Sequence, residues 1–458
     1  MKIKRLLPLV IIPFVISGCN NQKKNSDGKG SDKEKKTVTL TMQGIANTSR
    51  SEPYTLTFDY DMAYFDNSAT IFNDDLKMLS FASACAGSDE RIATSFFEAM
   101  GFVDHYSHSY YVTSEDSIGY FYSHQSLENF DLFAVSIRGF NYGEEWANNF
   151  TIGEEGDHQG FSLRANEMLT TLKSFVNSNR QSTELPYKIW MTGYSRAGGI
   201  ANVLADRLLK DESNFIGEND LFVYTFEAPA GLDSETAEAY PNVFNLINTR
   251  DLVTRIPPIE YGLKRCGVDV DIYSSAVDTL VTSFDNGIEI PQFHAKANTY
   301  GNELEFINHL IAKLLSASEN EDYIDYAITT RSQYVSVFQT PISKLMPFFL
   351  SLTDEELATL SAALEEDGIS AFMALYSEDG LGTLLASILG NEKVNDDIKA
   401  SLEVLRKYLL AHPSLLGEFI SFSPVGLNQN MLDNVKRVIF MHYPEVTYSL
   451  IKNKKFAQ

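Results

Sequence analysis

The sequence predicts an α/β protein in which a mainly parallel sheet is flanked by helices and accompanied by a separate helical block. Between about residues 130 and 260, short runs rich in β-branched and aromatic residues alternate with segments of helical periodicity. From about residue 300 to 440 the apolar periodicity is helical alone. Alternating strands and helices are typical of a parallel sheet with helices packed on its faces.

Four segments have the length and composition of buried strands: 132–139, 187–193, 221–229 and 243–248. The segments after the first and the second strand each place their apolar residues on one helical face. These residues are Phe161, Ala165, Met168, Leu169, Leu172, Phe175 and Val176 in the first helix, and Ile200, Val203, Leu204 and Leu208 in the second. The order strand, helix, strand, helix, strand therefore predicts the central sheet.

The flanking regions have a different character. Residues 37–130 contain an expected strand pair, "TVTLTMQ" and "YTLTFDYD", and a helix around "DDLKMLSFASACA". Helical segments follow residue 300, and Thr353 with Glu356 fits a capping box that begins one of them. We therefore expect a core over 37–300, a helical cap or insertion over 301–430, and a C-terminal core segment over 431–458.

The N-terminus predicts export and anchoring. Three basic residues precede "LLPLVIIPFVISGC", an apolar stretch that is too short to span a membrane and that two prolines interrupt. Residues 1–18 are therefore expected to be a signal peptide. The ending "VISGC" resembles the bacterial lipobox, so Cys19 is the expected lipidated first mature residue, on a polar tether over 19–36. The alternative is an ordinary signal peptide with an incidental cysteine. The predicted location is the extracytoplasmic side of the cell membrane.

Charge and cysteine content exclude several classes of partner. A formal net charge of −24 argues against nucleic acid and against attraction to anionic lipid, so the lipid anchor is the only expected membrane contact. Besides Cys19 only Cys85 and Cys266 are present, which allows a single disulfide bridge. The sequence has neither a Cys/His metal motif nor a nucleotide-binding glycine loop, and it therefore implies no metal and no cofactor. Nothing in it indicates an oligomeric state.

The motif "GYSRAGG" places Ser195 between a predicted strand and a predicted helix. A tight turn of this kind needs small neighbours, which Gly193, Ala197 and Gly198 supply. A serine at the bend would project its hydroxyl at a helix N-terminus, where partial positive charge stabilises an anion. The alternative is a phosphate-binding or purely structural turn. A nucleophilic serine also needs a base elsewhere in the chain.

Four stretches in order resemble the class 3 lipases of the α/β-hydrolase fold. They are "LFAVSIRGFNYGEEWANNF", "HQGF", "TGYSRAGGIANVLA", and "VYTFEAPAGL" followed by "NLINTRDLVTRIPPIEYGLKRCG". The resemblance spans residues 132–267. It implies an α/β-hydrolase fold with Ser195 as nucleophile, and a serine carboxylic-ester hydrolase, a lipase or esterase.

The triad of this fold runs in the order serine, acid, histidine along the chain. The family's Asp-x-Val motif assigns the acid to Asp251, which follows the last predicted strand. Glu227, at the end of the preceding strand, is the alternative acid. The acid orients the imidazole and stabilises its charged form, while the imidazole transfers the proton.

His442 is the preferred base, because "FMHYPEVTYSLI" presents it in a turn and is similar to the C-terminal segment of clostridial-type relatives. His309, whose distance from the acid along the chain is close to that in compact family members, and His294, in a loop, are the alternatives. The remaining histidines are less suitable because they precede the serine or occupy a helix end: His105, His108, His124, His158 and His412.

The resemblance assigns two backbone N–H groups to the oxyanion hole, those of Arg196 and Phe140. The chain departs from the family at both positions. Phe140 stands where Thr or Ser is usual, so no side-chain hydroxyl is expected there. Arg196 stands in "SRAG" where Ser-Leu-Gly-Gly is common, and its charge is expected to alter what the pocket accepts.

A cap of amphipathic helices suits esters with apolar acyl chains, because closing helices exclude water. The expected substrates are acylglycerols or shorter esters, with phospholipase A-type activity as a variant. The rival hypothesis is a non-catalytic surface lipoprotein that binds lipid, peptide or glycan on a hydrolase scaffold. A peptide-bond hydrolase is a third. An intact serine, acid and histidine in order argue against a binding protein, which has no physical reason to retain all three.

Overall fold

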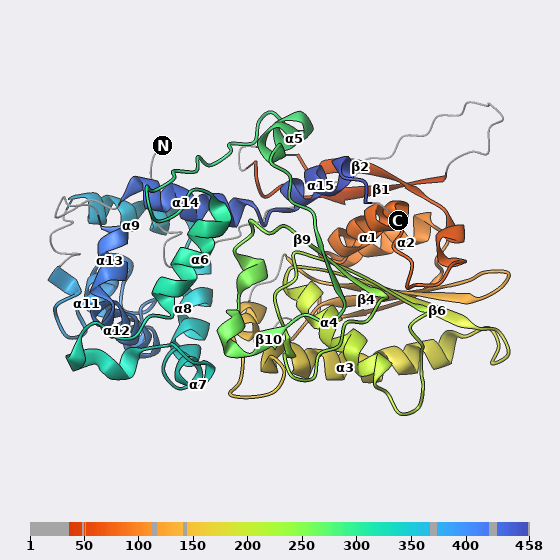
Figure 1. Cartoon of the computed structure of the whole chain (residues 1–458), viewed down its shortest axis with the longest axis horizontal. Helices are drawn as coiled ribbons and strands as arrows, with labels where there is room; N and C mark the ends of the chain where they lie inside the picture. The colour runs from red at the N-terminus through yellow and green to blue at the C-terminus, as the bar shows by residue number, and fades with distance from the viewer. Residues whose placement is uncertain are drawn as a thin grey trace.

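The computed structural model describes residues 36–456 except 48–49, 51, 112–116, 141–143, 367–372 and 421–427. The expected signal peptide, Cys19 and nearly all of the expected tether lie outside the described residues. Over the described part of the chain, a sheet lies at one end of the long axis and a block of helices at the other (Figure 1).

The central sheet has seven strands in the order β11-β9-β7-β6-β5-β4-β3. They are β3 (Asp104–His108), β4 (Tyr120–Ser126), β5 (Asp131–Ile137), β6 (Tyr187–Tyr194), β7 (Leu221–Phe226), β9 (Val243–Ile247) and β11 (Val268–Asp271). The five strands from β5 to β11 pair in parallel, and β3 and β4 pair antiparallel. The α/β class and all four strands expected from the sequence are confirmed.

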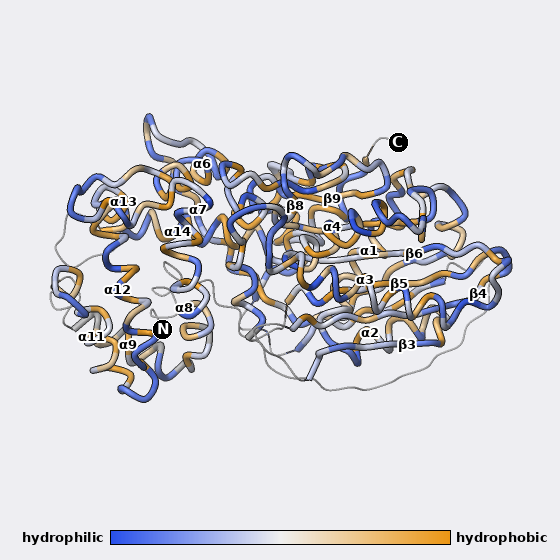
Figure 2. Tube along the Cα trace, turned by 90° about the horizontal axis from the view of Figure 1, so that it is seen from below, coloured by the Kyte–Doolittle hydropathy of each residue, from blue (hydrophilic) through white to orange (hydrophobic). Residues whose placement is uncertain are grey.

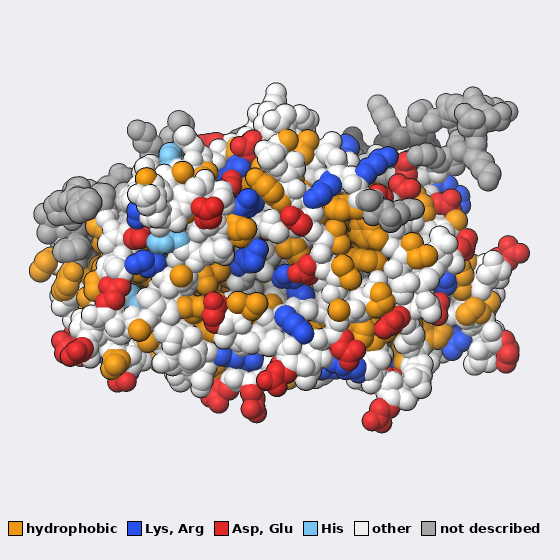
Figure 3. All heavy atoms as spheres, in the orientation of Figure 1, with side chains coloured by type: hydrophobic (Ala, Val, Ile, Leu, Met, Phe, Trp, Pro, Cys, Tyr) orange, Lys and Arg blue, Asp and Glu red, His pale blue; other side chains and the backbone are white. Residues whose placement is uncertain are grey.

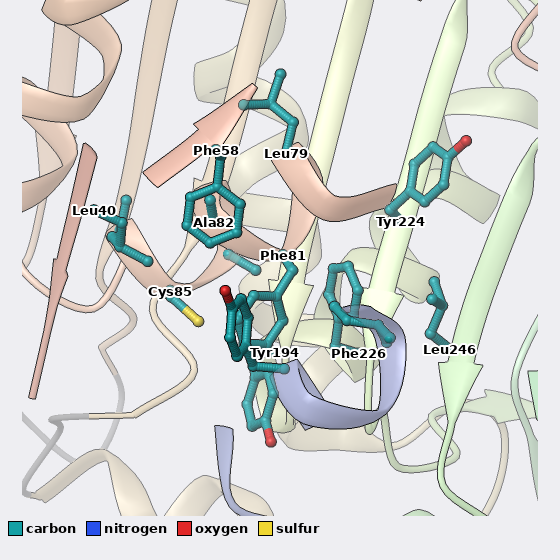
Figure 4. Packing of buried hydrophobic residues seen from close by; sticks show 14 of the residues in the cluster. Leu40, Phe58, Leu79, Phe81, Ala82, Cys85, Tyr194, Tyr224, Phe226 and Leu246 are labelled. Carbon is teal, nitrogen blue, oxygen red and sulfur yellow. The ribbon is translucent and has the colours of Figure 1, made fainter. Parts of the chain in front are cut away.

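Two apolar clusters lie on the two faces of this sheet, because side chains alternate along each strand. On β6, Trp190 and Tyr194 belong to the first cluster, whereas Ile189 and Met191 belong to the second. The first cluster packs under α1 (Asp74–Ala86), α2 (Glu90–Ala99), α15 (Pro444–Asn453) and the hairpin of β1 (Lys36–Met42) with β2 (Tyr54–Tyr60). Figure 4 shows part of it. The second packs under α3 (Gln159–Asn179) and α4 (Arg196–Leu209).

The two described cysteines lie in different clusters. Cys85 belongs to the first cluster, with α1, and Cys266 belongs to the second. Both are buried free thiols, so the single bridge that the sequence allowed does not form. The sheet separates the two sulfur atoms, and packing rather than cross-linking holds this core together.

The chain after β11 is helical. Its helices are α5 (Val277–Phe284), α6 (Glu303–Leu314), α7 (Arg331–Gln333), α8 (Thr340–Leu350), α9 (Asp354–Glu366), α11 (Gly380–Leu389), α12 (Asp396–Ala411), α13 (Pro413–Phe419) and α14 (Gln429–Phe440). The capping box is confirmed: the Glu356 carboxylate accepts from Thr353 N–H at 2.7 Å, and Thr353 Oγ1 accepts from Glu356 N–H at 3.2 Å. Figures 1 and 2 both place α6 to α14 beside the sheet.

Arg331 links this helical block to the core through several hydrogen bonds. Arg331 donates from Nε to Gly153 O at 2.6 Å, from Nη1 to Gly156 O at 2.7 Å and from Nη2 to Ile152 O at 2.7 Å. These carbonyl groups belong to the loop before α3. Because the guanidinium is a rigid fork of five donors, it fixes the position of this loop relative to α7.

Charge is spread over the face of the molecule that Figure 3 shows. On the face in Figure 3, acidic and basic side chains are interspersed with apolar ones. Among the residues described, no helix combines the length and the apolar composition that crossing a membrane requires.

Glu445 is expected to make stability depend on pH. Its buried Oε1 accepts the backbone N–H groups of Ile45, at 2.5 Å, and Ala46, at 2.9 Å, and so anchors the segment after β1 to α15. Burial raises the pKa of Glu445 to about 6 from 4.5. The folded state therefore binds this proton more tightly than the unfolded state does, and stability falls as pH rises from about 4.5 to 6.

The expected loss of unfolding free energy from this group is about 2 kcal/mol. Urea unfolding of wild type and Glu445→Gln between pH 4 and 7 measures it, because the amide does not titrate. The wild-type free energy should fall relative to that of the variant over this interval. Parallel curves for the two proteins would contradict the prediction.

Candidate active site

The strand-to-helix turn at Ser195 has strained backbone geometry. Ser195 follows β6 directly and precedes α4, with φ 56° and ψ −129°. Its N–H donates to Phe226 O at 2.8 Å and its carbonyl oxygen accepts from Gly198 N–H at 2.8 Å. A non-glycine residue in this region costs about 1–3 kcal/mol and persists only where its surroundings hold it.

Small residues are required around this turn. A Cβ at position 193 would lie 2.4 Å from the backbone oxygen of Ala197, and a Cβ at position 198 would lie 2.8 Å from the Cβ atom of Ala228. Both distances are shorter than atoms can approach. Gly193 and Gly198 therefore allow the helix to start immediately after the strand, as the motif predicts.

Three side chains that are distant in the sequence meet at this turn. His442 Nε2 lies 2.8 Å from Ser195 Oγ, and His442 Nδ1 lies 2.6 Å from Asp251 Oδ2. Asp251 is fully buried and His442 nearly so, whereas Ser195 is half-buried and accessible from solvent. The two contacts join positions 247 and 191 residues apart.

The loop between α14 and α15 holds the histidine. His442 N–H donates to Ile439 O at 2.9 Å, and the Tyr194 hydroxyl donates to His442 O at 2.6 Å. Asp251 is oriented in turn by Val253 N–H, which donates to Oδ1 at 2.8 Å. Backbone groups on both sides therefore fix the ring and the carboxylate.

The structure does not bring the alternative histidines to Ser195. His309 Nε2 lies 3.1 Å from the carboxylate of Glu418, and His294 Nε2 lies 3.5 Å from Asp433 Oδ2. Both rings are engaged within or beside the helical block. His309 lies on α6, and its ring faces Glu418 of α13. The distance along the chain between His309 and Asp251 does not indicate this contact.

Glu227, the alternative acid, contacts Asp251 rather than the histidine. It follows β7 and is fully buried. Its Oε2 accepts from Asn248 N–H at 2.8 Å and its Oε1 from the Thr447 hydroxyl at 3.0 Å, and its carboxyl group interacts with that of Asp251. Burial, and next the charge of Asp251, raise the pKa of Glu227 well above its usual range.

The two segments expected to supply oxyanion donors lie beside the turn. A Cβ at Gly139 would lie 2.1 Å from Tyr194 O, so the backbone there runs against the residue before Ser195. The Phe140 ring meets the Tyr194 ring edge-on, with centroids 5.9 Å apart. Arg196 opens α4.

The Arg196 side chain does not present its charge to a substrate pocket as the sequence led us to expect. It is 2% exposed, and its Nη1 lies 2.7 Å from Glu145 Oε2. Glu145, in the 3-10 helix η3 (Glu144–Phe150), also accepts from Arg138 Nη2 and from Ser117 Oγ at 3.2 Å. Arg196 therefore braces the loop after β5. Sequence reasoning did not identify Glu145, because no local pattern indicates its partners.

Replacing Glu145 with Ala is expected to lower the free energy of unfolding by about 3–5 kcal/mol, because it leaves two buried guanidinium groups without this carboxylate. Chemical denaturation measures the loss. The control is Arg91→Ala, which removes a surface ion pair whose arginine side chain is 66% exposed. That change should have little effect. Equal effects of the two substitutions would show that the buried network does not stabilise the fold.

The fold and this geometry are those of the α/β-hydrolase class. A serine at a strained strand-to-helix turn contacts an imidazole that contacts a buried carboxylate, at the carboxyl ends of parallel strands. Residues 134–261 match the family model of the class 3 lipases. This segment contains Ser195 and Asp251, whereas His442 lies beyond it. The protein is a carboxylic-ester hydrolase.

Several solved lipase structures are similar to part of the chain at low identity. A triacylglycerol lipase is 18% identical, with 45% of this chain and 83% of that chain covered and a TM-score of 0.36. The Rhizomucor miehei lipase propeptide complex is 17% identical, with 52% of this chain and 83% of that chain covered and a TM-score of 0.35. A lipase from Rhizopus microsporus var. chinensis is 16% identical, with 50% of this chain and 82% of that chain covered and a TM-score of 0.33. No curated protein is significantly similar to the chain.

Proposed function

We propose that this protein hydrolyses carboxylic esters of lipids, acylglycerols or related esters, with Ser195 as nucleophile, His442 as general base and Asp251 as the acid that orients it. The observation that carries the proposal is the continuous contact from Ser195 Oγ to His442 Nε2, at 2.8 Å, and from His442 Nδ1 to Asp251 Oδ2, at 2.6 Å. Both distances allow hydrogen bonds in the order that proton transfer needs.

In the proposed reaction, Ser195 Oγ attacks the ester carbonyl carbon while His442 Nε2 takes the hydroxyl proton. The oxygen of the tetrahedral intermediate accepts hydrogen bonds from the N–H groups of Arg196 and Phe140. The intermediate then expels the alcohol, which receives its proton from His442. A water molecule, deprotonated by the same ring, attacks the acyl-serine and releases the carboxylic acid.

The apolar surroundings of the acid support a lipid ester as substrate. Leu252, the residue after Asp251, belongs to the apolar cluster built by α6, α12 and α14, and its N–H donates to Val438 O at 3.3 Å. Downstream of it, Ile256 and Ile259 are 38% and 79% exposed. Apolar side chains of the core and of the helical block therefore meet next to the proposed site, where an acyl chain could be bound away from water.

Labelling with a fluorophosphonate probe, combined with hydrolysis of p-nitrophenyl esters of increasing chain length, tests the proposal. Wild type should be labelled and should hydrolyse the esters, with kcat/KM rising with acyl length, and Ser195→Ala should do neither. A wild-type protein without labelling or turnover would favour a binding protein. A labelled protein that cleaves peptides and leaves esters intact would favour the peptide-bond hydrolase.

Gly139→Ala is expected to reduce kcat by about 10² to 10³, because the added methyl group would push the 139–140 backbone away from Tyr194 and displace one oxyanion donor. Steady-state kinetics with a soluble ester measures the loss. The matched control is Gly217→Ala, since a Cβ at Gly217 meets nothing within 4 Å. Wild-type turnover in Gly139→Ala would remove the 139–140 loop from the proposed mechanism.

The proposed location is the extracytoplasmic face of a bacterial membrane, with a lipid on Cys19. The support is the sequence "VISGC" after a short apolar stretch, followed by a polar tether. Metabolic labelling with a fatty acid in a bacterial host should mark wild type and leave Cys19→Ala unmarked. Equal labelling of the two would refute the anchor at Cys19.

A further inference from the structure

Glu227 occupies a second strained position beside the nucleophile turn. It follows β7 with φ 51°, next to β6, after which Ser195 has φ 56°. Its N–H donates to Leu246 O at 3.0 Å, which continues the ladder to β9. A buried non-glycine residue with positive φ costs free energy, and such residues concentrate at functional sites. The strained backbone at Glu227 therefore indicates a functional role for its carboxyl group.

Glu227 is at the centre of a network that joins all parts of the proposed triad. It accepts hydrogen bonds from Asn248 N–H and the Thr447 hydroxyl. Asn248 Nδ2 donates to Met441 O at 3.0 Å, directly before His442. Thr447 Oγ1 also lies 3.0 Å from the Tyr194 hydroxyl, which donates to the carbonyl oxygen of the histidine. The strand of the nucleophile, the acid loop and the histidine loop are thus linked through one carboxyl group.

A hydrogen bond between Glu227 and Asp251 requires a proton. Two carboxylates cannot hydrogen-bond each other unless one is protonated, because an ionised carboxylate only accepts. Asp251 already accepts from His442 Nδ1 at Oδ2 and from Val253 N–H at Oδ1, so both of its oxygen atoms are acceptors in these contacts. Burial and the charge of Asp251 raise the pKa of Glu227. These effects assign the proton to Glu227.

The other titratable groups near Glu227 do not compete for this role. Tyr194, from β6, and Cys85, from α1, are buried, and burial raises the pKa of each above its usual range, so both are neutral. His442 faces Asp251 from the α14–α15 loop. Among the described residues, Asp251 is the charged neighbour that raises the pKa of Glu227 most, after burial.

We propose that Glu227 is a positioning residue of this site, which as a neutral carboxylic acid donates a hydrogen bond to Asp251 and so holds the carboxylate that orients His442. The inference rests on the proposed function. Asp251 then accepts three hydrogen bonds, and the pair of acids carries a single negative charge. Glu227 touches neither substrate nor the reacting atoms, and it acts through Asp251.

Two substitutions distinguish the loss of a hydrogen-bond donor from the loss of a negative charge at position 227. In Glu227→Gln, the amide oxygen can accept from Asn248 N–H, and the NH₂ group can donate to Asp251 and to Thr447 Oγ1, whose hydroxyl turns to the Tyr194 oxygen. This variant replaces one neutral donor by another. Glu227→Leu removes the donor. Asn242→Leu is the matched control, because it also places leucine at a buried polar position, at the other end of β7, where Asn242 donates to Leu221 O.

The kinetic test uses a soluble ester and compares kcat, KM and the acid limb of the pH–rate profile, which reports protonation of the base. Glu227→Gln should keep kcat within about threefold and leave the acid limb in place. Glu227→Leu should lower kcat about 10- to 100-fold and leave KM within about twofold. Asn242→Leu should lower the melting temperature and leave kcat unchanged.

Two results would overturn the inference. A shift of the acid limb by more than about half a pH unit in Glu227→Gln would mean that a negative charge had been removed. Wild-type kcat in Glu227→Leu would mean that the donor does not position Asp251. If Glu227→Leu fails to fold, the infrared band of a protonated carboxyl group decides. At about pH 8, where other carboxyl groups are ionised, it should be present in wild type and absent in Glu227→Gln.

The same experiment distinguishes this failure from failure of the proposed function. A wild-type protein that neither reacts with a fluorophosphonate nor hydrolyses esters refutes the proposed function and the positioning role with it. A wild-type protein that does both, with the Glu227 variants behaving in either way above, refutes only the role of Glu227.

Discussion

Ser195→Ala and His442→Ala are each expected to reduce kcat for ester hydrolysis by about 10⁴ to 10⁶, and the double variant is expected to be no less active than either single one. The serine and the histidine act as a unit: the hydroxyl is a weak nucleophile without the base, and the base has nothing to deprotonate without the hydroxyl. The 2.8 Å contact between Ser195 Oγ and His442 Nε2 is the structural basis of this coupling. Steady-state kinetics on the two single variants and the double variant measures it.

The fold should survive the substitution of Ser195. Alanine keeps the Cβ atom at position 195 and removes the Oγ contact with His442 Nε2, at 2.8 Å. The hydrogen bonds of the turn are made by the N–H and carbonyl groups of residue 195, which the substitution retains. Ser174→Ala serves as a matched control, because Ser174 Oγ donates to the backbone oxygen of Thr170 on the surface of α3. Losses that multiply in the double variant would contradict a shared mechanism.

Asp251→Asn is expected to lower kcat by about 10⁴ with little change in fold. The carboxylate accepts from His442 Nδ1 at 2.6 Å, which selects the tautomer whose Nε2 can take a proton from Ser195. An amide can instead donate to Nδ1, and it then favours the other tautomer. It also cannot stabilise the imidazolium that forms during the reaction. A pH–rate profile together with kcat measures both effects.

Asp269→Asn is the matched control for this substitution. Asp269, on β11, is half-exposed and pairs with Arg265 at 2.6 Å, so its loss should leave kcat unchanged. A loss of less than about tenfold in Asp251→Asn would mean that another carboxyl group, with Glu227 the nearest candidate, can serve as the acid.

The strands and helices of the core were predictable where the signal is local. The runs at 132–139 and 187–193 correspond to β5 and β6, because β-branched and aromatic residues in short runs favour buried strands. The expected pair at the N-terminus forms the hairpin of β1 and β2. The edge strands β3, "DHYSH", and β11, "VDVD", were not predicted, because partly exposed and polar segments lack that pattern.

The site was predictable to different degrees. A strand-to-helix turn requires small residues at neighbouring positions in the sequence, so Ser195 and its small neighbours could be identified directly. The choice among His442, His309 and His294 rested on resemblance and on turn context, because spacing along the chain does not measure distance in space. Arg196 was misjudged for the same reason: the carboxylate that pairs with it, Glu145, lies 51 residues away.

The sequence by itself determined the alternation of strands and helices, the strained turn at Ser195 and the capped helices of the block, since each depends on contacts between residues close along the chain. Only the tertiary structure decided which histidine meets the serine, that Cys85 and Cys266 lie on opposite faces of the sheet, and that Glu227 stands behind Asp251. Those relations come from how the sheet, α14 and α15 pack together, and packing joins positions that no local pattern connects.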